Sequence, residues 1–436
     1  MKGLFTRLLP FVPDSVGAIA AFADSPALVI VNDMNGTLST FHQRVGQPAG
    51  SPLTLRSAKD VRELSYAMGA EDDLLRNYRK IIGRLEGTER DFRFVVLVPG
   101  PVAATVGVDA ARLARRLETE LGMPALAVDC TGNRPYDQGI SEALLAVFRR
   151  VAEKRPAAPE PGRVGVAGLN RLDQQGDAAR DAYARLLANL ASAEDVTCLD
   201  SWDGQPHWER AAACERVVVA TSSGLALARA MERAWGTPFA RADDLAAGAE
   251  GAGVGTGGSP AAAPPAVGLP AVGLPAGALV RPGQRVLIVG EQIEANLLRR
   301  AIGGAGPHSG ENVRVAWFFA MDAAHQAPGD VRLAGESDLA ALAREGVFDA
   351  VLADPALRPC LPQGTPLFPF RNLAVGDGPA SGTPHAAELR LQASRGDQAP
   401  WREGASLQPE PPAWTPAWFK TLREFLAACA SSGNAD

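Results

Sequence analysis

The sequence predicts an α/β protein of three units, each built around a largely parallel β-sheet. Short apolar runs alternate with longer amphipathic stretches along most of the chain, which is the pattern of repeated βαβ units. Loops that contain glycine follow many of the apolar runs. With 436 residues, of which 46% are hydrophobic, the chain is long enough to bury several cores.

The first unit covers residues 1–155. Its clearest helix is 109–121, where apolar side chains recur at 110, 113, 114 and 117, the spacing of one helical face. The predicted strands are 28–31, 94–98 and 125–128, and the predicted helices are 58–68, 72–85, 109–121 and 141–151.

A proline-rich boundary at 154–162 precedes the second unit, residues 163–245. Its predicted strands are 163–169, 196–199 and 217–220, and its predicted helices are 177–191, 206–213 and 225–235. Residues 246–279 are rich in Ala, Gly and Pro and repeat the sequence AVGLP. Such a composition cannot bury a core, so we expect a flexible or partly polyproline linker, with a binding segment as the alternative.

The third unit covers residues 280–375. Its predicted strands are 286–289, 313–319 and 347–353, and its predicted helices are 293–302 and 339–344. Residues 376–436 are expected to form a polar loop and then an amphipathic helix at 414–430.

Charge and cysteine usage exclude several classes of protein. A net charge of -6 without a Lys/Arg block argues against a nucleic-acid surface. No apolar stretch approaches the roughly 20 residues that span a bilayer, and Pro10, Pro13 and Asp14 interrupt the N-terminal apolar stretch. The five cysteines form no C-x-x-C pair, which argues against disulfides or a zinc ribbon. We expect a cytoplasmic protein with no nucleic-acid or membrane partner.

Two loops at the ends of predicted strands are the first candidates for ligand binding. The loop after the second strand contains Pro101, and the loop after the first contains, in order, Asp33, Asn35, Gly36 and Thr37. In open α/β sheets, ligands bind where the strands end in such loops. Asp33 and Asn35 therefore either line a pocket or satisfy their own backbone as turn residues.

Three polar residues that precede predicted helices are further candidates. Asp109 either faces a ligand or caps its helix. Ser222 and Ser223 come just before a helix start, where exposed N–H groups suit an anion, although serine there is also a common cap. No G-x-G-x-x-G, P-loop or H-E-x-x-H motif occurs, which disfavours a dinucleotide, nucleotide or zinc-protease site.

The densest polar group in the sequence is Asp129, Cys130, Tyr136 and Asp137. Cys130 follows a predicted strand and lies near a possible helix start, where a thiolate can be stabilised. It is therefore the candidate metal or redox residue of this chain. The alternative is a small buried side chain, the usual role of a free cysteine.

Four blocks of sequence occur in a characteristic order: LLPFVPDSVG at 8–17, DMNG at 33–36, VPGPVAATVGVD at 98–109 and DCTGNRPYDQG at 129–139. Together they resemble the corresponding blocks of nitrogenase component 1-type oxidoreductases, in a divergent branch. Further blocks at 64–80, 222–228 and 290–296 match as well, so the resemblance covers almost the whole chain apart from the linker and the C-terminal region. It implies three Rossmann-like parallel-sheet domains around a central cleft, as in nitrogenase component 1.

The same resemblance places three cysteine ligands of the family on other residues here. Its cluster ligand in the first loop corresponds to Thr37, a second to Pro101, and the cysteine that holds the active-site cofactor to Ala220. An iron–sulfur cluster is held by thiolates, usually four. The resemblance therefore implies an iron–sulfur cluster only if a partner chain supplies the ligands, and otherwise no cofactor.

The implied function is that of a subunit of a nitrogenase-like oxidoreductase complex. Such a subunit would form a homo- or heterodimer with a related component 1-type chain and bind or reduce a substrate or cofactor. Electron transfer from a separate ATP-dependent iron–sulfur reductase would drive it. The alternative is a cluster-free homologue that acts as a cofactor-assembly scaffold or regulatory binding partner, which the missing thiolates favour.

No catalytic residue is assigned from the sequence. The candidate cofactor-binding residues are Asp33, Asn35, Gly36, Thr37, Pro101, Asp109, Asp129, Cys130, Tyr136, Asp137, Ser222 and Ser223, with Cys130 as the candidate metal ligand.

Overall fold

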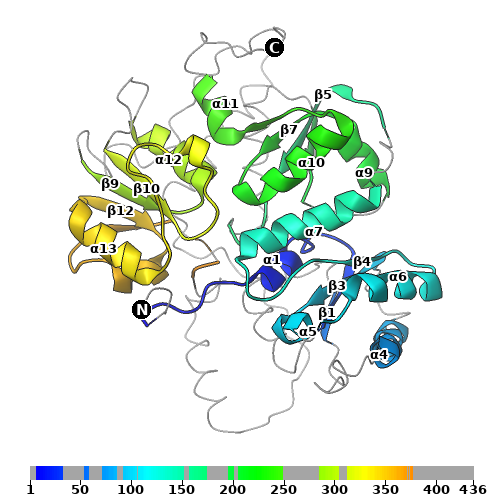
Figure 1. Cartoon of the computed structure of the whole chain (residues 1–436). Helices are drawn as coiled ribbons and strands as arrows, with labels where there is room; N and C mark the ends of the chain where they lie inside the picture. Colours follow the sequence, from blue (N-terminus) through cyan, green and yellow to red (C-terminus); the bar gives the residue numbers. More distant parts are fainter. Residues whose placement is uncertain are drawn as a thin grey trace, which may run out of the picture.

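The structure is a computed structural model (Figure 1). It describes residues 6–32, 54–57, 71–85, 92–105, 107–151, 157–173, 195–200, 205–248, 284–303, 312–370, 372 and 374–376.

Three parallel β-sheets form the framework, as the sequence predicts. Their strand orders are β2-β1-β3-β4, β6-β5-β7-β8 and β11-β10-β9-β12-β13. In each sheet the chain first forms a central strand, then continues to one edge of the sheet, and then crosses to the other side of the central strand. The order therefore reverses between β1 and β3, between β5 and β7, and between β9 and β12. Ligands of doubly wound sheets bind at such reversal points, beyond the carboxyl ends of the strands.

The first sheet and its helices follow the predicted order. The elements are α1 (Asp14–Ala20), β1 (Ala27–Asn32), β2 (Thr54–Ser57), α4 (Glu71–Gly83), β3 (Phe94–Pro99), α5 (Pro101–Thr105), α6 (Ala110–Leu121), β4 (Ala125–Ala127) and α7 (Tyr136–Val151). The prediction was wrong about the start of α7, which was expected at 141. Gly139 lies inside the helix, where it allows the close approach described below. The predicted helix 58–68 lies outside the described residues.

The second unit contains a four-stranded sheet. Its elements are β5 (Glu160–Ala167), β6 (Asp195–Cys198), α9 (Gln205–Ala212), β7 (Cys214–Val219), the 3₁₀ helix η1 (Ser222–Gly224), α10 (Leu225–Trp235), β8 (Phe239–Arg241) and α11 (Ala242–Gly248). The start of β5 lies within the proline-rich boundary, and α11 includes the first residues of the predicted linker. The rest of that linker and the predicted helix 177–191 lie outside the described residues.

The third unit contains a five-stranded sheet. Its elements are β9 (Val286–Val289), α12 (Gln292–Gly303), β10 (Val313–Trp317), η2 (Ala323–His325), β11 (Val331–Arg332), α13 (Glu336–Gly346), β12 (Ala350–Ala353), η3 (Pro355–Cys360) and β13 (Leu367–Pro369). The predicted strand 347–353 starts later, because Val347 ends α13 in the left-handed conformation with a φ of 44°. The C-terminal helix predicted at 414–430 lies outside the described residues, and the exact domain boundaries stay predictions.

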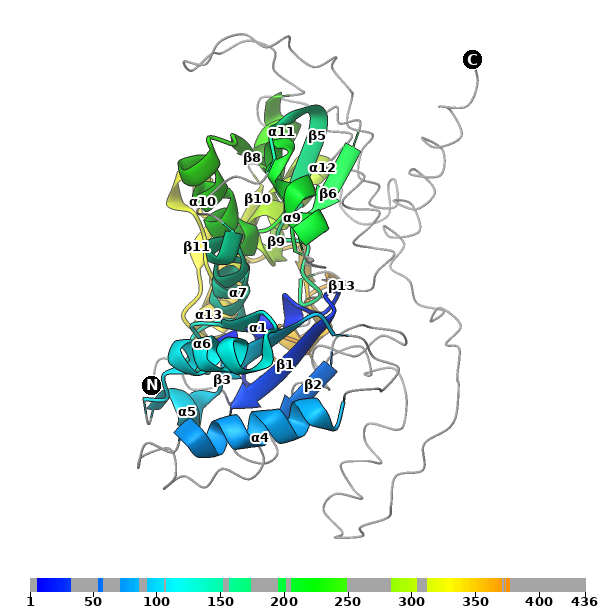
Figure 2. The same cartoon turned by 90° about the vertical axis from the view of Figure 1, so that its right-hand side faces the viewer.

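Helices cover both faces of the first sheet (Figure 2). All residues of β1 and β3 are buried, as expected for a parallel sheet covered on both sides. On one face, Leu74 of α4 and Leu113 of α6 belong to one apolar cluster with Leu28. On the other face, the apolar side chains of α1 and α7 join a large cluster that continues into the second and third units. The three units thus share one core on the α7 side.

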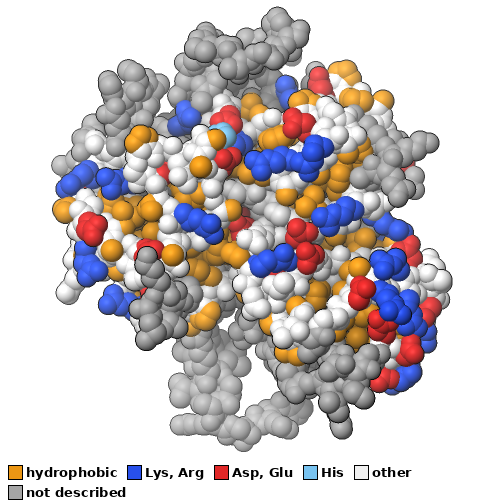
Figure 3. Space-filling model, viewed as in Figure 1, with side chains coloured by type: hydrophobic (Ala, Val, Ile, Leu, Met, Phe, Trp, Pro, Cys, Tyr) orange, Lys and Arg blue, Asp and Glu red, His pale blue; other side chains and the backbone are white. Residues whose placement is uncertain are grey.

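Charged side chains gather on the outer helices of the first unit, at the lower right of Figure 3. They include ion pairs of Arg116 with Asp72 at 2.7 Å and of Arg112 with Glu71 at 3.3 Å, all on α4 or α6 or at their ends. Exposed pairs of this kind contribute little to stability. Of the helices that the structure describes, none is long and apolar enough to cross a membrane.

The crossing of α1 and α7 brings two backbones into direct contact. A Cβ atom at Gly17 would lie 2.0 Å from the carbonyl oxygen of Tyr136, and one at Gly139 would lie 1.8 Å from that of Asp14. Only glycine fits at either position, because the other backbone occupies the space of a side chain. The two glycines therefore fix where Tyr136, the first residue of α7, lies.

We expect Gly139→Ala to lower the free energy of unfolding by about 3 kcal/mol or more, because the new methyl group overlaps a backbone that cannot move away. Urea denaturation followed by circular dichroism measures the change. Gly83→Ala is the matched control, since a Cβ at this helical position meets nothing within 4 Å. It should leave stability unchanged or raise it by about 0.4–1 kcal/mol. Equal effects of the two substitutions would contradict the role given to the crossing.

Candidate functional site

Polar side chains from all three units meet where α7 begins. We call this group the three-sheet junction. It consists of Tyr136 and Asp137 from α7, Asn170 and Asp173 after β5, Ser222 and Ser223 after β7, Glu291 after β9, and Asn372 after β13. Because the residues of the second and third units follow parallel strands, they lie at the carboxyl ends of the two sheets.

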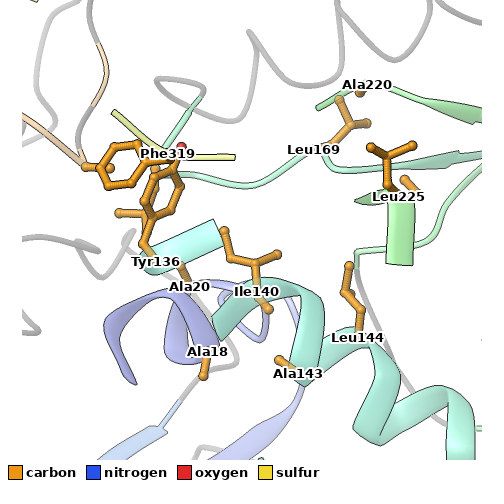
Figure 4. Packing of buried hydrophobic residues seen from close by; sticks show 14 of the residues in the cluster. Ala18, Ala20, Tyr136, Ile140, Ala143, Leu144, Leu169, Ala220, Leu225 and Phe319 are labelled. Atoms are coloured by element: carbon orange, nitrogen blue, oxygen red, sulfur yellow. The ribbon is translucent and has the colours of Figure 1, made fainter. Parts of the chain in front are cut away.

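Tyr136 is the member that the first unit contributes to the centre of the junction. Its ring is buried edge-on against Phe319, with ring centroids 4.8 Å apart, and Figure 4 shows the two side by side above Ile140. Its hydroxyl donates a hydrogen bond to Asp173 of the second unit. Asp173 also accepts one from the Asn372 amide of the third unit, at 3.0 Å. One buried carboxyl therefore joins all three units.

Asn170 extends this network towards the start of α10. Its amide nitrogen donates to Asp173 at 2.6 Å and to the Ser223 hydroxyl at 3.2 Å. The Ser223 hydroxyl in turn lies 2.8 Å from that of Thr221, and the Ser141 hydroxyl of α7 donates to the Ser223 carbonyl at 2.8 Å. Ser223 therefore lies in a hydrogen-bond network that runs from β5 to β7 and α7.

The position at Ser222 is occupied by a carboxyl group of the protein itself. The carboxylate of Glu291 accepts hydrogen bonds from the Ser222 hydroxyl and from the Ser222 backbone N–H, the latter at 2.9 Å. Its other oxygen accepts from the N–H groups of Ile293 and Glu294 at 2.9 and 3.1 Å. Glu291 thus caps α12 and fills the anion position that the sequence suggests at Ser222.

Asp137 ties the start of α7 to the third unit. One of its oxygens accepts a hydrogen bond from the Ala320 N–H at 3.1 Å, and the other from the Gln138 N–H at 3.0 Å. The side chain is buried, and this burial raises its pKa despite the two donors. The predicted site residue Asp137 is therefore part of the junction.

Burial dominates the electrostatics of the junction. It raises the pKa of Asp173, and it raises the pKa of Glu291 to about 7, with the negative charge of Asp173 as the next cause. The hydrogen bonds that Ser222 donates lower the pKa of Glu291, but they offset only part of this rise. A carboxyl with such a pKa can bind and release a proton near neutral pH. The junction can therefore hold a proton between the second and third sheets.

Two other predicted residues have structural partners. The Asp109 side chain accepts a hydrogen bond from the Arg112 N–H at 2.8 Å and so caps α6, which is the alternative reading of this residue. Pro101 begins α5 and packs against Gly132, where a Cβ would lie 2.4 Å from the proline ring. Pro101 therefore lies just after β3, at the start of α5 and against Gly132.

Asp129 and Cys130 lie outside the junction. The Asp129 side chain is 70% exposed and lies 3.6 Å from the Arg134 guanidinium. The Cys130 thiol is buried, and this burial, with the charge of Asp14 as a smaller cause, raises its pKa far above the usual value. It is therefore a neutral thiol near pH 7, the alternative that the sequence left open. In the part of the chain that the structure describes, no group of three or more His, Cys, Asp or Glu side chains is arranged to hold a metal ion.

Asp33, Asn35, Gly36 and Thr37 lie outside the described residues, so their predicted role is untested. The strand that leads to them ends at Asn32, whose buried side chain accepts a hydrogen bond from the Tyr78 hydroxyl at 2.6 Å. The first loop therefore begins from a fixed strand end.

The sequence analysis missed four residues of the site. Asn170 and Asp173 follow β5 as Asp33 follows β1, so the rule for strand ends could have found them. Glu291 follows β9, so the same rule could have found it. Asn372 carries no recognisable sequence signal. Its N–H donates a hydrogen bond to the Asp354 side chain at 2.9 Å, and this contact depends on the fold.

Similarity to known proteins agrees with this architecture. No family model and no curated protein matches the sequence. The solved structure "Nitrogenase Cp1 at pH 6.5" is similar to this chain with a TM-score of 0.58 and 11% identity, covering 94% of this chain and 98% of that one. "Nitrogenase Cp1 at pH 5" is similar with a TM-score of 0.52 and 11% identity, covering 92% and 93%.

The chain has a nitrogenase component 1-like fold. The resemblance carried by the four sequence blocks is therefore confirmed at the level of the fold. Three of those blocks include residues that the structure describes, and two of them meet at the crossing of α1 and α7, through Gly17 and Gly139.

We expect Tyr136→Phe to lower the free energy of unfolding by about 1–3 kcal/mol, because the buried Asp173 carboxyl loses a donor. Chemical denaturation of the full chain measures the loss. Tyr78→Phe is the control, since it removes a buried tyrosine hydroxyl that donates to a neutral amide within the first unit. Its expected cost is about 0.5–1.5 kcal/mol. A Tyr136→Phe effect no larger than that of the control would contradict the role of Asp173 as the link between units.

The raised pKa of Glu291 predicts a loss of stability as the pH rises. The folded state keeps the Glu291 proton up to a pH of about 7, whereas the unfolded state releases it near 4.5. Between these values the folded state binds more protons, so unfolding becomes easier by up to about 1.4 kcal/mol per pH unit. We expect Glu291→Gln to remove this contribution to the pH dependence of stability. The free energy of unfolding, measured from pH 4.5 to 8, gives that dependence.

Glu336→Gln provides the comparison for this pH profile. Hydrogen bonds from Thr6 and from backbone N–H groups lower the pKa of Glu336 to about 2. The contribution of Glu336 to the free energy of unfolding is therefore present above pH 4.5 and is lost as the pH falls towards 2. The Glu336→Gln curve should run parallel to that of the unmodified protein above pH 5. If the Glu291→Gln curve is parallel there too, the assignment of the slope to Glu291 is wrong.

Proposed function

We propose that this chain is a subunit of a nitrogenase-like oxidoreductase complex, which binds or reduces a substrate or cofactor with electrons from a separate ATP-dependent iron–sulfur reductase. The observation that carries the proposal is the nitrogenase component 1-like fold over 94% of the chain. A similarity that spans all three units favours a component 1-like subunit over a protein that shares only one domain with it.

The three-sheet junction has a positioning role in this proposal. Its hydrogen bonds fix the carboxyl ends of the second and third sheets relative to each other through Asp173, Ser222 and Glu291. Ligands of α/β sheets bind beyond those strand ends. The junction would therefore hold the walls of a binding site at constant separation, while its buried carboxyls supply a proton-holding group.

The described residues do not fit a resident iron–sulfur cluster of this chain alone. Pro101 and Ala220 offer no thiolate, and Ala220 is fully buried with its N–H bonded to the Ala167 carbonyl at 2.7 Å. Cys130 is a buried neutral thiol, whereas cluster ligands are thiolates. In the proposal, any cluster is held by cysteines of a related component 1-type partner, at the interface of a dimer.

The decisive experiment compares this chain alone with its complex. The chain is expressed anaerobically by itself and together with a component 1-type chain that keeps the cysteines corresponding to Thr37, Pro101 and Ala220. Iron, acid-labile sulfide and the visible spectrum are measured after purification. We expect no cluster on the chain alone and a cluster on the complex, reduced by the iron–sulfur reductase only when ATP is present.

Two outcomes would overturn parts of this proposal. A stable complex without metal or redox activity would favour the cluster-free alternative, a cofactor-assembly scaffold or regulatory binding partner. A cluster on the chain purified alone would show that the partner does not supply the ligands.

A further inference from the structure

A pocket outside the junction is lined by the N-terminal residues Thr6 and Arg7 and by residues of α13 and of the end of η3. Its volume is about 360 Å³, within the range of small-molecule sites. Figure 1 shows the N-terminal end of the described chain beside α13. None of the residues proposed for the oxidoreductase function lines this pocket.

The N-terminal segment is fixed in place by Glu336 of α13. One carboxylate oxygen accepts hydrogen bonds from the Thr6 N–H at 2.8 Å and from the Thr6 hydroxyl, and the other from the N–H groups of Arg7 and Leu8 at 3.0 Å each. Four donors thus surround the charge of Glu336 and turn it towards the backbone. The same bonds fix the backbone of Arg7, which lines the pocket.

Two guanidinium groups line the pocket without a carboxylate partner. Arg7 donates to the Pro359 carbonyl at 3.2 Å, and the Arg344 Nε donates to the Ala340 carbonyl at 3.0 Å. Both bonds orient the side chain and leave other guanidinium N–H groups. Among the residues that the structure describes, no carboxylate forms an ion pair with Arg7 or Arg344. A guanidinium with free N–H groups is the preferred partner of a carboxylate or phosphate.

The rest of the lining divides into a polar and an apolar part. Ser337 lies in the first turn of α13, where the helix dipole favours negative charge. Cys360 and Leu361 are buried and supply apolar surface. Burial raises the pKa of the Cys360 thiol to about 11, so it adds no negative charge at neutral pH.

We propose that this pocket binds a small organic anion, with a carboxylate or phosphate group between Arg7 and Arg344 and an apolar body against Leu361. The two arginines supply charge and donors, and Ser337 adds a hydroxyl. Glu336, the one carboxylate among the described lining residues, is already satisfied by four donors. This inference is independent of the proposed oxidoreductase function, because it concerns binding to the chain without a partner.

Isothermal titration of the full chain tests the proposal with three probes: phenyl phosphate, benzoate and inorganic phosphate. The two aromatic probes distinguish a phosphate from a carboxylate head group, and inorganic phosphate measures the head group alone. We expect at least one aromatic probe to bind with a Kd below about 1 mM, more tightly than inorganic phosphate, and to bind more weakly as salt is added.

Variants assign the binding to the pocket. Arg344 is exposed, so Arg344→Gln should fold normally and weaken binding about tenfold. Arg7→Gln should act in the same direction. Arg358→Gln is the matched control, because Arg358 is an exposed residue of η3 that does not line the pocket, and it should leave the Kd unchanged. The absence of binding of all three probes at about 10 mM, or equal effects of Arg344→Gln and Arg358→Gln, would overturn the proposal. Neither result would bear on the cluster experiment.

Discussion

The contact of α1 with α7 is the constraint on which the rest of the structure depends. At Gly17 and Gly139 each helix accepts the backbone of the other where a side chain would stand. The buried carboxylate of Asp14 secures the same crossing, because it accepts hydrogen bonds from the Arg134 side chain at 2.9 Å and from the Thr131 N–H at 2.8 Å. Thr131 and Arg134 belong to the loop just before α7, which starts at Tyr136. The crossing therefore decides where the first turn of α7 contacts the second and third units.

From that first turn, polar contacts reach both remaining sheets. Tyr136 meets Asp173 of the second unit, and Asp137 meets the backbone of the third. Three acidic side chains are thereby buried together, which is costly unless donors surround them. Here, serine and amide side chains and the N–H groups at helix starts provide those donors. The arrangement keeps the carboxyls satisfied, but burial still raises their pKa values.

Local patterns predict the framework well and the junction only in part. Strands such as 94–98 and helices such as 109–121 follow from apolar spacing within a few residues of sequence. Of the junction residues, Tyr136 and Asp137 were named as members of the densest polar group in the sequence, and Ser222 and Ser223 because they come just before a helix start. The partners of these residues were missed, since the contact of Ser222 with Glu291 joins positions 69 residues apart. No spacing rule predicts a contact that depends on how separate sheets pack.

The same distinction applies to the positions to which the nitrogenase component 1 resemblance assigns cysteine ligands. Gly17 and Gly139 are constrained by a backbone contact within the chain, which any function of this fold would need. Pro101 is half-buried and lies against Gly132, and Ala220 is fully buried directly after β7. At the Ala220 position a small apolar side chain fits the close packing of the core. A component 1-like framework can therefore form without thiolates at these two positions, because Gly17, Gly139 and the junction hold it together through contacts within the chain.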